Sequence, residues 1–101
     1  LGVELWRTDG TSLGTEIVRD IYSGSASSHP SLLTRYQNRL VFDATISGTR
    51  RQVFISDGTS QGTFPACREV MCEQATGFEV IEQSLYMAAR SEFGEELLVF
   101  P

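Results

Sequence analysis

Residues 4–15 read Glu-Leu-Trp-Arg-Thr-Asp-Gly-Thr-Ser-Leu-Gly-Thr, and residues 52–63 read Gln-Val-Phe-Ile-Ser-Asp-Gly-Thr-Ser-Gln-Gly-Thr. The two stretches match at a constant offset, so that Trp6 aligns with Phe54 and Asp9 aligns with Asp57. Self-similarity at a fixed spacing indicates a repeat protein. The repeat therefore has to be explained before any single residue is interpreted.

Each copy of the motif predicts a strand followed by a hairpin loop. The aromatic and branched residues alternate with polar ones, as in a half-buried strand. Asp-Gly then marks a turn, since an Asp carboxylate accepts hydrogen bonds from nearby backbone N–H groups and Gly adopts positive φ without steric cost. We expect the second glycine of each copy to adopt positive φ as well and to close the loop. The residues assigned to these structural turns are Asp9, Gly10, Thr11, Gly14, Thr15, Asp57, Gly58, Thr59, Gly62 and Thr63.

A cation or a sugar bound by the two loops is the functional alternative to this structural interpretation. Calcium takes about six to eight oxygen ligands, usually from several carboxylates and carbonyls. Each loop offers one Asp, which favours the structural interpretation. We expect no catalytic residue, no cofactor and no metal site in the chain.

Composition limits the class of protein and of partner. The 101-residue chain has a net charge of −5, and its eight basic residues are all arginine. This balance argues against a nucleic-acid partner, and we interpret the pair Arg50-Arg51 as a solvated strand end. No apolar run approaches the roughly 20 residues that a membrane helix requires. The sequence starts at Leu1 and ends at Pro101 in the middle of the repeat pattern, so we expect a piece of a longer protein.

The two cysteines, Cys67 and Cys72, lie five residues apart. A zinc site needs four ligands, which two Cys and one His cannot supply. A disulfide between them would stabilise the fold by about 2 kcal/mol in the chain-entropy model. Two free buried thiols are the alternative. A bridged pair would indicate an extracellular or lumenal protein.

The rest of the chain also alternates and predicts strands. In the strand over residues 39–46 one face is predicted to carry Leu40, Phe42, Ala44 and Ile46, and the other Val41, Asp43 and Thr45. Residues 23–31 and 71–77 are polar connectors between them. We expect a tight turn at Gln37-Asn38, with Asn38 in the left-handed conformation. The expected strands are Gly2–Thr8, Glu16–Ile21, Leu32–Tyr36, Arg39–Ile46, Arg51–Ser56, Phe64–Val70, Phe78–Ile81 and Leu85–Ala89, and a third copy of the motif strand begins at Gly94.

Four antiparallel strands in a unit of this length match the size of a propeller blade. The predicted fold is all-β, with four-stranded antiparallel β-propeller-like blades that form a fragment of a larger repeat array. Residues 1–22 would be the outer strands of a preceding blade, residues 23–71 one complete blade, and residues 72–101 the inner strands of the following blade. Other copies of the chain, flanking repeats of a longer chain or other protein subunits would have to cover the open sheet faces.

The run Glu4–Thr11, with Gly14-Thr15 and Val18–Ile21 after it, resembles the ELWxxDGT repeat. That repeat occurs in tandem arrays in secreted and surface proteins of bacteria and algae, including mastigoneme-like proteins of algal flagellar hairs. The second copy departs from it, with Gln52–Ile55 in place of Glu-Leu-Trp-x. The resemblance implies a non-catalytic, propeller-like structural or adhesive module in an extracellular or cell-surface assembly, such as the hairs of a flagellum.

Two other functions are weighed against this one. In a carbohydrate-binding, lectin-like propeller, aromatic side chains would stack on glycans; the candidates are Trp6, Tyr22, Tyr36 and Tyr86. However, Trp6 and Phe54 share one repeat position, which predicts a repeated core or blade-to-blade contact instead. In an enzyme, catalysis would rest on His29 or on Glu4, Glu79, Glu95 and Glu96. A single exposed His among serines and two adjacent Glu on opposite faces of a strand form no constellation, so we expect no enzyme.

Overall fold

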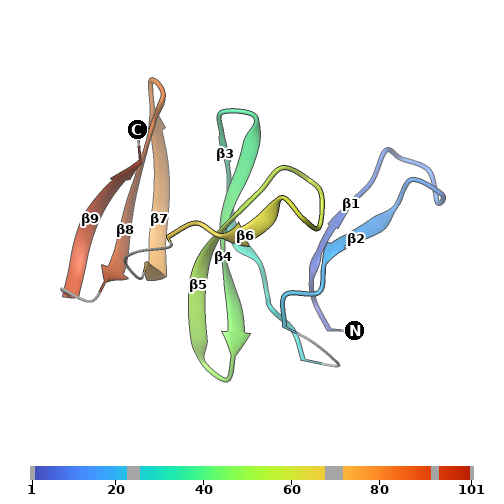
Figure 1. Cartoon of the computed structure of the whole chain (residues 1–101), viewed down its shortest axis with the longest axis horizontal. Helices are drawn as coiled ribbons and strands as arrows, with labels where there is room; N and C mark the ends of the chain where they lie inside the picture. Colours follow the sequence, from blue (N-terminus) through green and yellow to red (C-terminus); the bar gives the residue numbers. More distant parts are fainter. Residues whose placement is uncertain (1, 23–25, 68–71, 92–93, 101) are drawn as a thin grey trace.

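The computed structural model describes residues 2–22, 26–67, 72–91 and 94–100. Within these ranges the chain forms strands and turns and no helix, which confirms the predicted all-β class. Figure 1 shows the strands in three groups that lie side by side. The strands are β1 (Leu5–Arg7), β2 (Glu16–Arg19), β3 (Ser31–Tyr36), β4 (Arg39–Ser47), β5 (Arg50–Ser56), β6 (Thr63–Pro65), β7 (Glu73–Ile81), β8 (Ser84–Ser91) and β9 (Gly94–Phe100).

The three groups follow one another along the chain. The first group, β1 and β2, is a separate two-stranded sheet, and the middle group contains β3, β4, β5 and β6 paired in chain order. The third group pairs β7, β8 and β9 in the same way. A pairing between Gln52 and Glu73 joins β7 to β5, so the middle and third groups share one sheet. All these pairings are antiparallel, and the described strands form open sheets that do not close into a ring.

One face of the middle group packs against the first group, and we call this contact the N-side core. Phe42 and Ala44 of β4 and Phe54 of β5 are buried there against Leu5 and Val18. The rings of Phe42 and Phe54 stack with their centroids 5.9 Å apart. Such aromatic pairs contribute beyond the area that they bury.

The opposite face packs against the third group, and we call this contact the C-side core. Strands that are covered on both faces carry apolar residues at nearly every position, because each neighbouring residue points to a different core. This explains the run of buried residues in β4 and β5. The buried members of the C-side core are Tyr36, Val41, Val53, Ile55, Cys72, Leu85, Met87 and Ala89.

The predicted alternation along β4 is confirmed. Phe42 and Ala44 lie in the N-side core, with Leu40 and Ile46 packed against it, whereas Val41 lies in the C-side core. The stripe of residues 40, 42 and 44 recurs as residues 85, 87 and 89, which fill the C-side core from β8. The two cores are therefore built from equivalent positions of successive sequence repeats.

The predicted connector at residues 71–77 is wrong in its described part. β7 begins at Glu73, which pairs with Arg90 of β8, and Gly77 pairs with Ala88. Polar and small residues suggest a loop, but β7 includes them, with pairing to β8 at Glu73 and Gly77 and an irregular register between these two residues. Propensity is a weak guide where neighbouring strands provide the pairing.

The return strand after the second loop is shorter than predicted. β6 ends at Pro65, whereas residues 68–71 of the expected strand lie outside the described residues. Among the described strands β6 pairs only with β5, so it lies at an edge of the sheet. An edge strand tolerates proline. β1 and β2 are also shorter than predicted, since pairing extends only over Leu5–Arg7 and Glu16–Arg19.

The tight turn at Gln37-Asn38 is confirmed, but the left-handed residue is Gln37, with φ of 57°, and not Asn38. The equivalent turn of the third group has the same form, with Glu82 at φ 57°. In a two-residue hairpin turn the first central residue alone can take positive φ. The geometry of the turn thus overrides the preference of Asn.

Cys67 and Cys72 form a disulfide, with their Cα atoms 5.8 Å apart. This confirms the predicted bridge and excludes the alternative of two free thiols. Cys72 is buried in the C-side core, and Cys67 packs against it. The disulfide therefore ties the end of the middle group to the start of the third.

Candidate functional site

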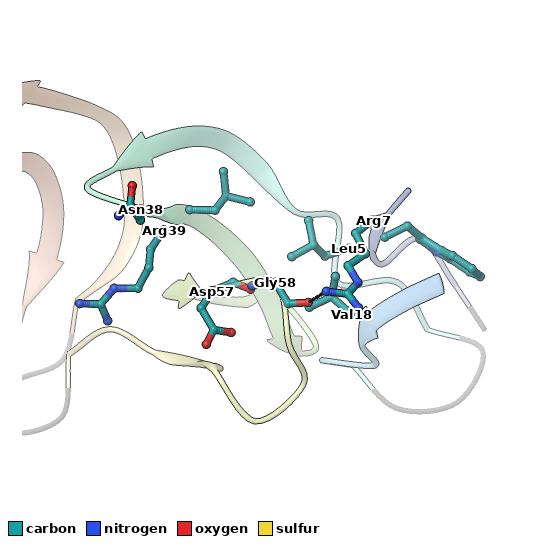
Figure 2. Close-up of a pocket in the computed structure, with 10 residues that line it drawn as sticks. Leu5, Arg7, Val18, Asn38, Arg39, Asp57 and Gly58 are labelled. Atoms are coloured by element: carbon teal, nitrogen blue, oxygen red, sulfur yellow. Dashed lines mark hydrogen bonds between the residues drawn. The ribbon is translucent and has the colours of Figure 1, made fainter. Parts of the chain in front are cut away.

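A groove of about 250 Å³ lies between the first group of strands and the second Asp-Gly-Thr loop (Figure 2). Leu5 and Val18 contribute apolar surface to it, whereas Arg39, Asp57 and Gly58 contribute polar atoms. The two copies of the sequence motif meet here, because β1 belongs to the first copy and Asp57 to the second. We therefore consider the two loops and the contacts between the copies as the candidate site.

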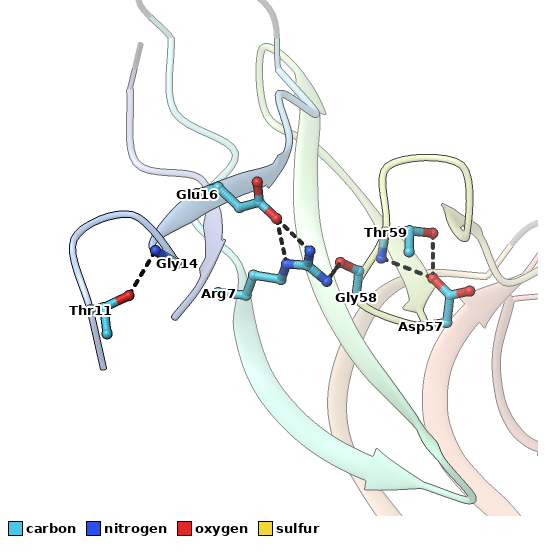
Figure 3. Close-up of polar contacts among 7 residues, drawn as sticks. All are labelled: Arg7, Thr11, Gly14, Glu16, Asp57, Gly58 and Thr59. Carbon is cyan, nitrogen blue, oxygen red and sulfur yellow. Dashed lines mark hydrogen bonds and ion pairs between the residues drawn. The ribbon is translucent and has the colours of Figure 1, made fainter. Parts of the chain in front are cut away.

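The loop aspartates accept hydrogen bonds from the threonine two residues on. Asp9 Oδ1 accepts from the backbone N–H of Thr11 at 2.9 Å and from its hydroxyl at 2.6 Å. Asp57 Oδ1 accepts from Thr59 in the same way, at 2.9 and 2.7 Å (Figure 3). This is the hydrogen-bonded turn that the sequence predicts, formed twice with the same atoms.

The two glycines of each loop serve different purposes. Gly10 and Gly58 have φ of 95° and 94°, a conformation that L side chains rarely adopt. Gly14 and Gly62 do not have positive φ, so our expectation for them is wrong. A Cβ atom at either position would overlap the carboxylate of the loop aspartate. Glycine is required there to leave room for the carboxylate, not to turn the backbone.

Threonine hydroxyls complete each loop. Thr11 Oγ1 accepts from the N–H of Gly14 at 2.9 Å, and Thr15 Oγ1 donates to the carbonyl of Thr11 at 2.6 Å. In the second loop Thr59 Oγ1 accepts from the N–H of its glycine, and Thr63 Oγ1 donates to the carbonyl of Thr59 at 2.6 Å. These polar groups hydrogen-bond to one another and to the backbone, which gives each loop a fixed shape.

Hydrogen bonding also favours the ionised form of the two loop aspartates. The side-chain and backbone bonds from Thr11 lower the pKa of Asp9, and those from Thr59 lower the pKa of Asp57. Both carboxylates are exposed, so the effect comes from bonding to the charged form and not from burial. Across the described ranges, no three His, Cys, Asp or Glu side chains lie close enough together to hold a metal ion.

Two arginines of the first copy reach the second loop. The guanidinium of Arg7 donates through Nε to Glu16 at 2.8 Å and through Nη1 to the carbonyl of Gly58 at 3.0 Å (Figure 3). Arg19 donates to the carbonyl of Thr63. These bonds connect the first group of strands to both ends of the second loop. These bonds could not be predicted from the sequence, because their acceptors are backbone carbonyls, which have no signature in the sequence.

Glu4, one of the carboxylates on which an enzyme would rely, is buried and hydrogen-bonds to a connector. Its carboxylate accepts from the N–H of Ile21 at 2.8 Å and from the N–H and hydroxyl of Ser28 at 3.0 and 2.8 Å. A buried carboxylate is tolerated only with such partners. Glu4 therefore fixes both sides of the segment between the first and middle groups.

Arg51 is not a solvated strand end, which corrects the interpretation of the Arg50-Arg51 pair. It donates to Asp43 Oδ2 at 2.6 Å, to the hydroxyl of Thr45 at 2.7 Å and to the hydroxyl of Ser31 at 2.8 Å. Burial raises the pKa of Asp43, although the hydrogen bond from Arg51 opposes this effect. The arginine thus connects β3, β4 and β5 through one partly buried polar cluster.

The two aromatic residues at the repeated position differ in burial. Phe54 is 4% exposed and lies in the N-side core, whereas Trp6 is 52% exposed within this chain. The first group of strands covers Phe54, and none of the described residues does the same for Trp6. Among the other aromatic candidates, Tyr36 is buried and the hydroxyl of Tyr22 accepts from the N–H of Gly48 at 3.0 Å.

Comparison with models of known protein families finds no match, and comparisons with curated proteins and with solved structures find none either. The described part of the chain contains no helix that is long and apolar enough to cross a membrane.

Proposed function

We propose that this chain is a segment of a non-catalytic structural or adhesive repeat array, built from four-stranded, propeller-like units and located outside the cell or at its surface. The observation that carries the proposal is the repetition of one packing mode on both faces of the middle group. The stripe of residues 40, 42 and 44 fills the N-side core, and the equivalent residues 85, 87 and 89 fill the C-side core. Stacking of equivalent units is the organising principle of repeat proteins.

The polar chemistry of the loops supports a passive role. The loop carboxylates and threonine hydroxyls hydrogen-bond within their own loops, and Arg7 and Arg19 bond to the neighbouring loop. Each of these groups therefore stabilises the shape of a unit or the contact between two units. The partners that we propose are flanking repeats of a longer chain or other protein subunits of the same assembly, as the resemblance to ELWxxDGT arrays implies.

The disulfide supports the proposed location. Disulfides form and persist in oxidising compartments, which include the extracellular space. Immunogold labelling of source cells before and after permeabilisation tests the proposal. We expect label on surface structures or extracellular filaments without permeabilisation. Label confined to the cell interior would contradict the proposed location and role.

Glycan binding is a second candidate, favoured by the exposure of Trp6. An exposed indole offers an apolar face on which a sugar ring can stack. A glycan array with the wild-type chain and the Trp6→Ala variant tests this function. Specific binding that is lost in the variant would support a lectin-like module, whereas an array without specific binders would exclude it for the glycans displayed.

A further inference from the structure

Three equivalent strands, β1, β5 and β9, show which sheet faces remain open. Residues 2–5 read Gly-Val-Glu-Leu and residues 94–97 read Gly-Glu-Glu-Leu, so Leu97 takes the position of Leu5. The alignment of the two Asp-Gly-Thr copies in turn places Leu5 with Val53. Each strand therefore carries an apolar residue on the face directed towards the next group along the chain. The residues before and after it lie on the opposite face.

Residues at this position are buried wherever a following group exists in the structure. Leu5 packs in the N-side core against the middle group, and Val53, at 1% exposure, packs in the C-side core against the third group. Leu97 is 68% exposed, and Val99 on the same face is half-exposed. Ala88 of β8 pairs with Leu97 and extends this face. We call Leu97, Val99 and Ala88 the tail face.

The next position along the same strands shows the opposite orientation. Phe54 points back to the first group, and Leu98 points back to the middle group, where it packs on the C-side core. Trp6 occupies this position in β1 and is half-exposed, and Ile17 of β2 pairs with it. We call Trp6 and Ile17 the head face.

The geometry points to head-to-tail self-association, in which the head face of one copy of this chain packs on the tail face of another. The contact continues the packing inside the chain, because Leu97 would meet Trp6 as Leu5 and Val18 meet Phe54 in the N-side core. This inference deepens the proposed function by naming a second copy as the partner. The two faces are different surfaces, so the contact is heterologous and each copy keeps a free face for another. Association then continues beyond the dimer into a ring or a filament.

Sedimentation velocity of the disulfide-intact 101-residue chain over a range of concentrations tests the inference. We expect a mass that rises with concentration beyond two copies. Trp6→Glu blocks the head face and Leu97→Glu blocks the tail face, and each should abolish association. Both side chains are exposed, so circular dichroism should show the wild-type strand content for each variant. Leu13→Glu is the matched control, because Leu13 is 97% exposed, lies in the first loop and belongs to neither face, and it should leave association unchanged.

Mixing the two blocked variants gives the sharpest test. The free tail of the Trp6→Glu chain can bind the free head of the Leu97→Glu chain, but neither complex can extend. We expect an equimolar mixture to form a 1:1 dimer and nothing larger, although each variant alone is monomeric. A monomeric wild-type chain at all concentrations, association that survives both variants, a monomeric mixture, or equal inhibition by Leu13→Glu would each overturn the inference. The proposed extracellular role would stand in these cases, because immunogold labelling tests it separately.

Discussion

The N-side and C-side cores have the same apolar arrangement, but different interactions connect the neighbouring groups of strands at each core. Both cores bury the same stripe from the second strand of a group. At the N-side core, Arg7 and Arg19 bond to backbone carbonyls of the second loop. At the C-side core, a disulfide and the ion pair between Arg50 and Glu73 connect the groups. The apolar contact is thus a repeated property, whereas each polar connection is particular to its interface.

The largest expected effect comes from the apolar stripe itself. Phe42→Ala should destabilise the fold by about 3–5 kcal/mol, because it removes a fully buried ring and leaves a cavity. Met87→Ala, at the equivalent position of the C-side core, should cost about 2–5 kcal/mol. Urea unfolding measures both, and Phe42→Leu serves if the alanine variant does not fold. A much smaller loss of stability in one of the two variants would show that Phe42 and Met87 do not have equivalent roles in their cores.

The disulfide should contribute the next largest effect, and only at the C-side core. Removing the bridge in the double variant Cys67→Ala/Cys72→Ala should cost about 2 kcal/mol in the chain-entropy model. Reduction of the wild-type chain should lower its urea midpoint by a similar amount, while the double variant should not respond to reductant. A wild-type midpoint that is insensitive to complete reduction would contradict this prediction.

The two loops can be compared through their second glycines. Gly14→Ala and Gly62→Ala should each cost about 1–3 kcal/mol, because the added Cβ overlaps the aspartate carboxylate and forces a local shift. The cost should fall when the aspartate is also replaced, as in Gly62→Ala/Asp57→Ala. A double-mutant cycle in urea measures this coupling. Additive effects would show that the carboxylate does not restrict the glycine position.

Arg7 should have a small effect, because its ion pair with Glu16 is exposed. Arg7→Met should cost about 0.2–1 kcal/mol at low salt, the usual range for exposed ion pairs. High salt should reduce the part that comes from Glu16. Measuring the variant and the wild type at two salt concentrations separates that part from the bond to Gly58. If Arg7→Met lowered the free energy of unfolding by more than removal of the disulfide does, the Arg7 contacts would be the stronger of the two connections, contrary to this prediction.

The smallest expected effect is a pH dependence of the loops. The pKa values of Asp9 and Asp57 are lowered in the folded state, so the ionised form is favoured by folding. This stability is present above the ordinary carboxyl pKa and is lost as the pH falls through the lowered folded-state values. Asp43 has the opposite sign, since its raised pKa favours the protonated form at low pH. Urea midpoints of Asp57→Asn and of the wild type between pH 2 and about 6 should converge at the acidic end.

Local interactions explain why the loops could be predicted and their second glycines could not. The Asp-to-Thr hydrogen bonds join residues two apart, so the motif contains both partners. The role of Gly14 depends on where the carboxylate of Asp9 lies after the loop has folded back on itself. Glu4 and Arg51 show the same limit over longer distances. Their partners, such as Ser28 and Ser31, lie about 20 residues or more away in the sequence and have ordinary side chains.

The all-β class, the repeat, the alternation along β4 and the hydrogen bonds of the aspartate loops could be predicted from the sequence, because each depends on residues that are close together in the chain. The burial of Phe54 and exposure of Trp6, the inclusion of residues 73–77 in β7, and the arginine contacts between the two copies depend on tertiary packing. Burial and pairing depend on which group lies against a given face. Two residues in identical positions of a repeat therefore have different environments when one has a neighbour and the other does not.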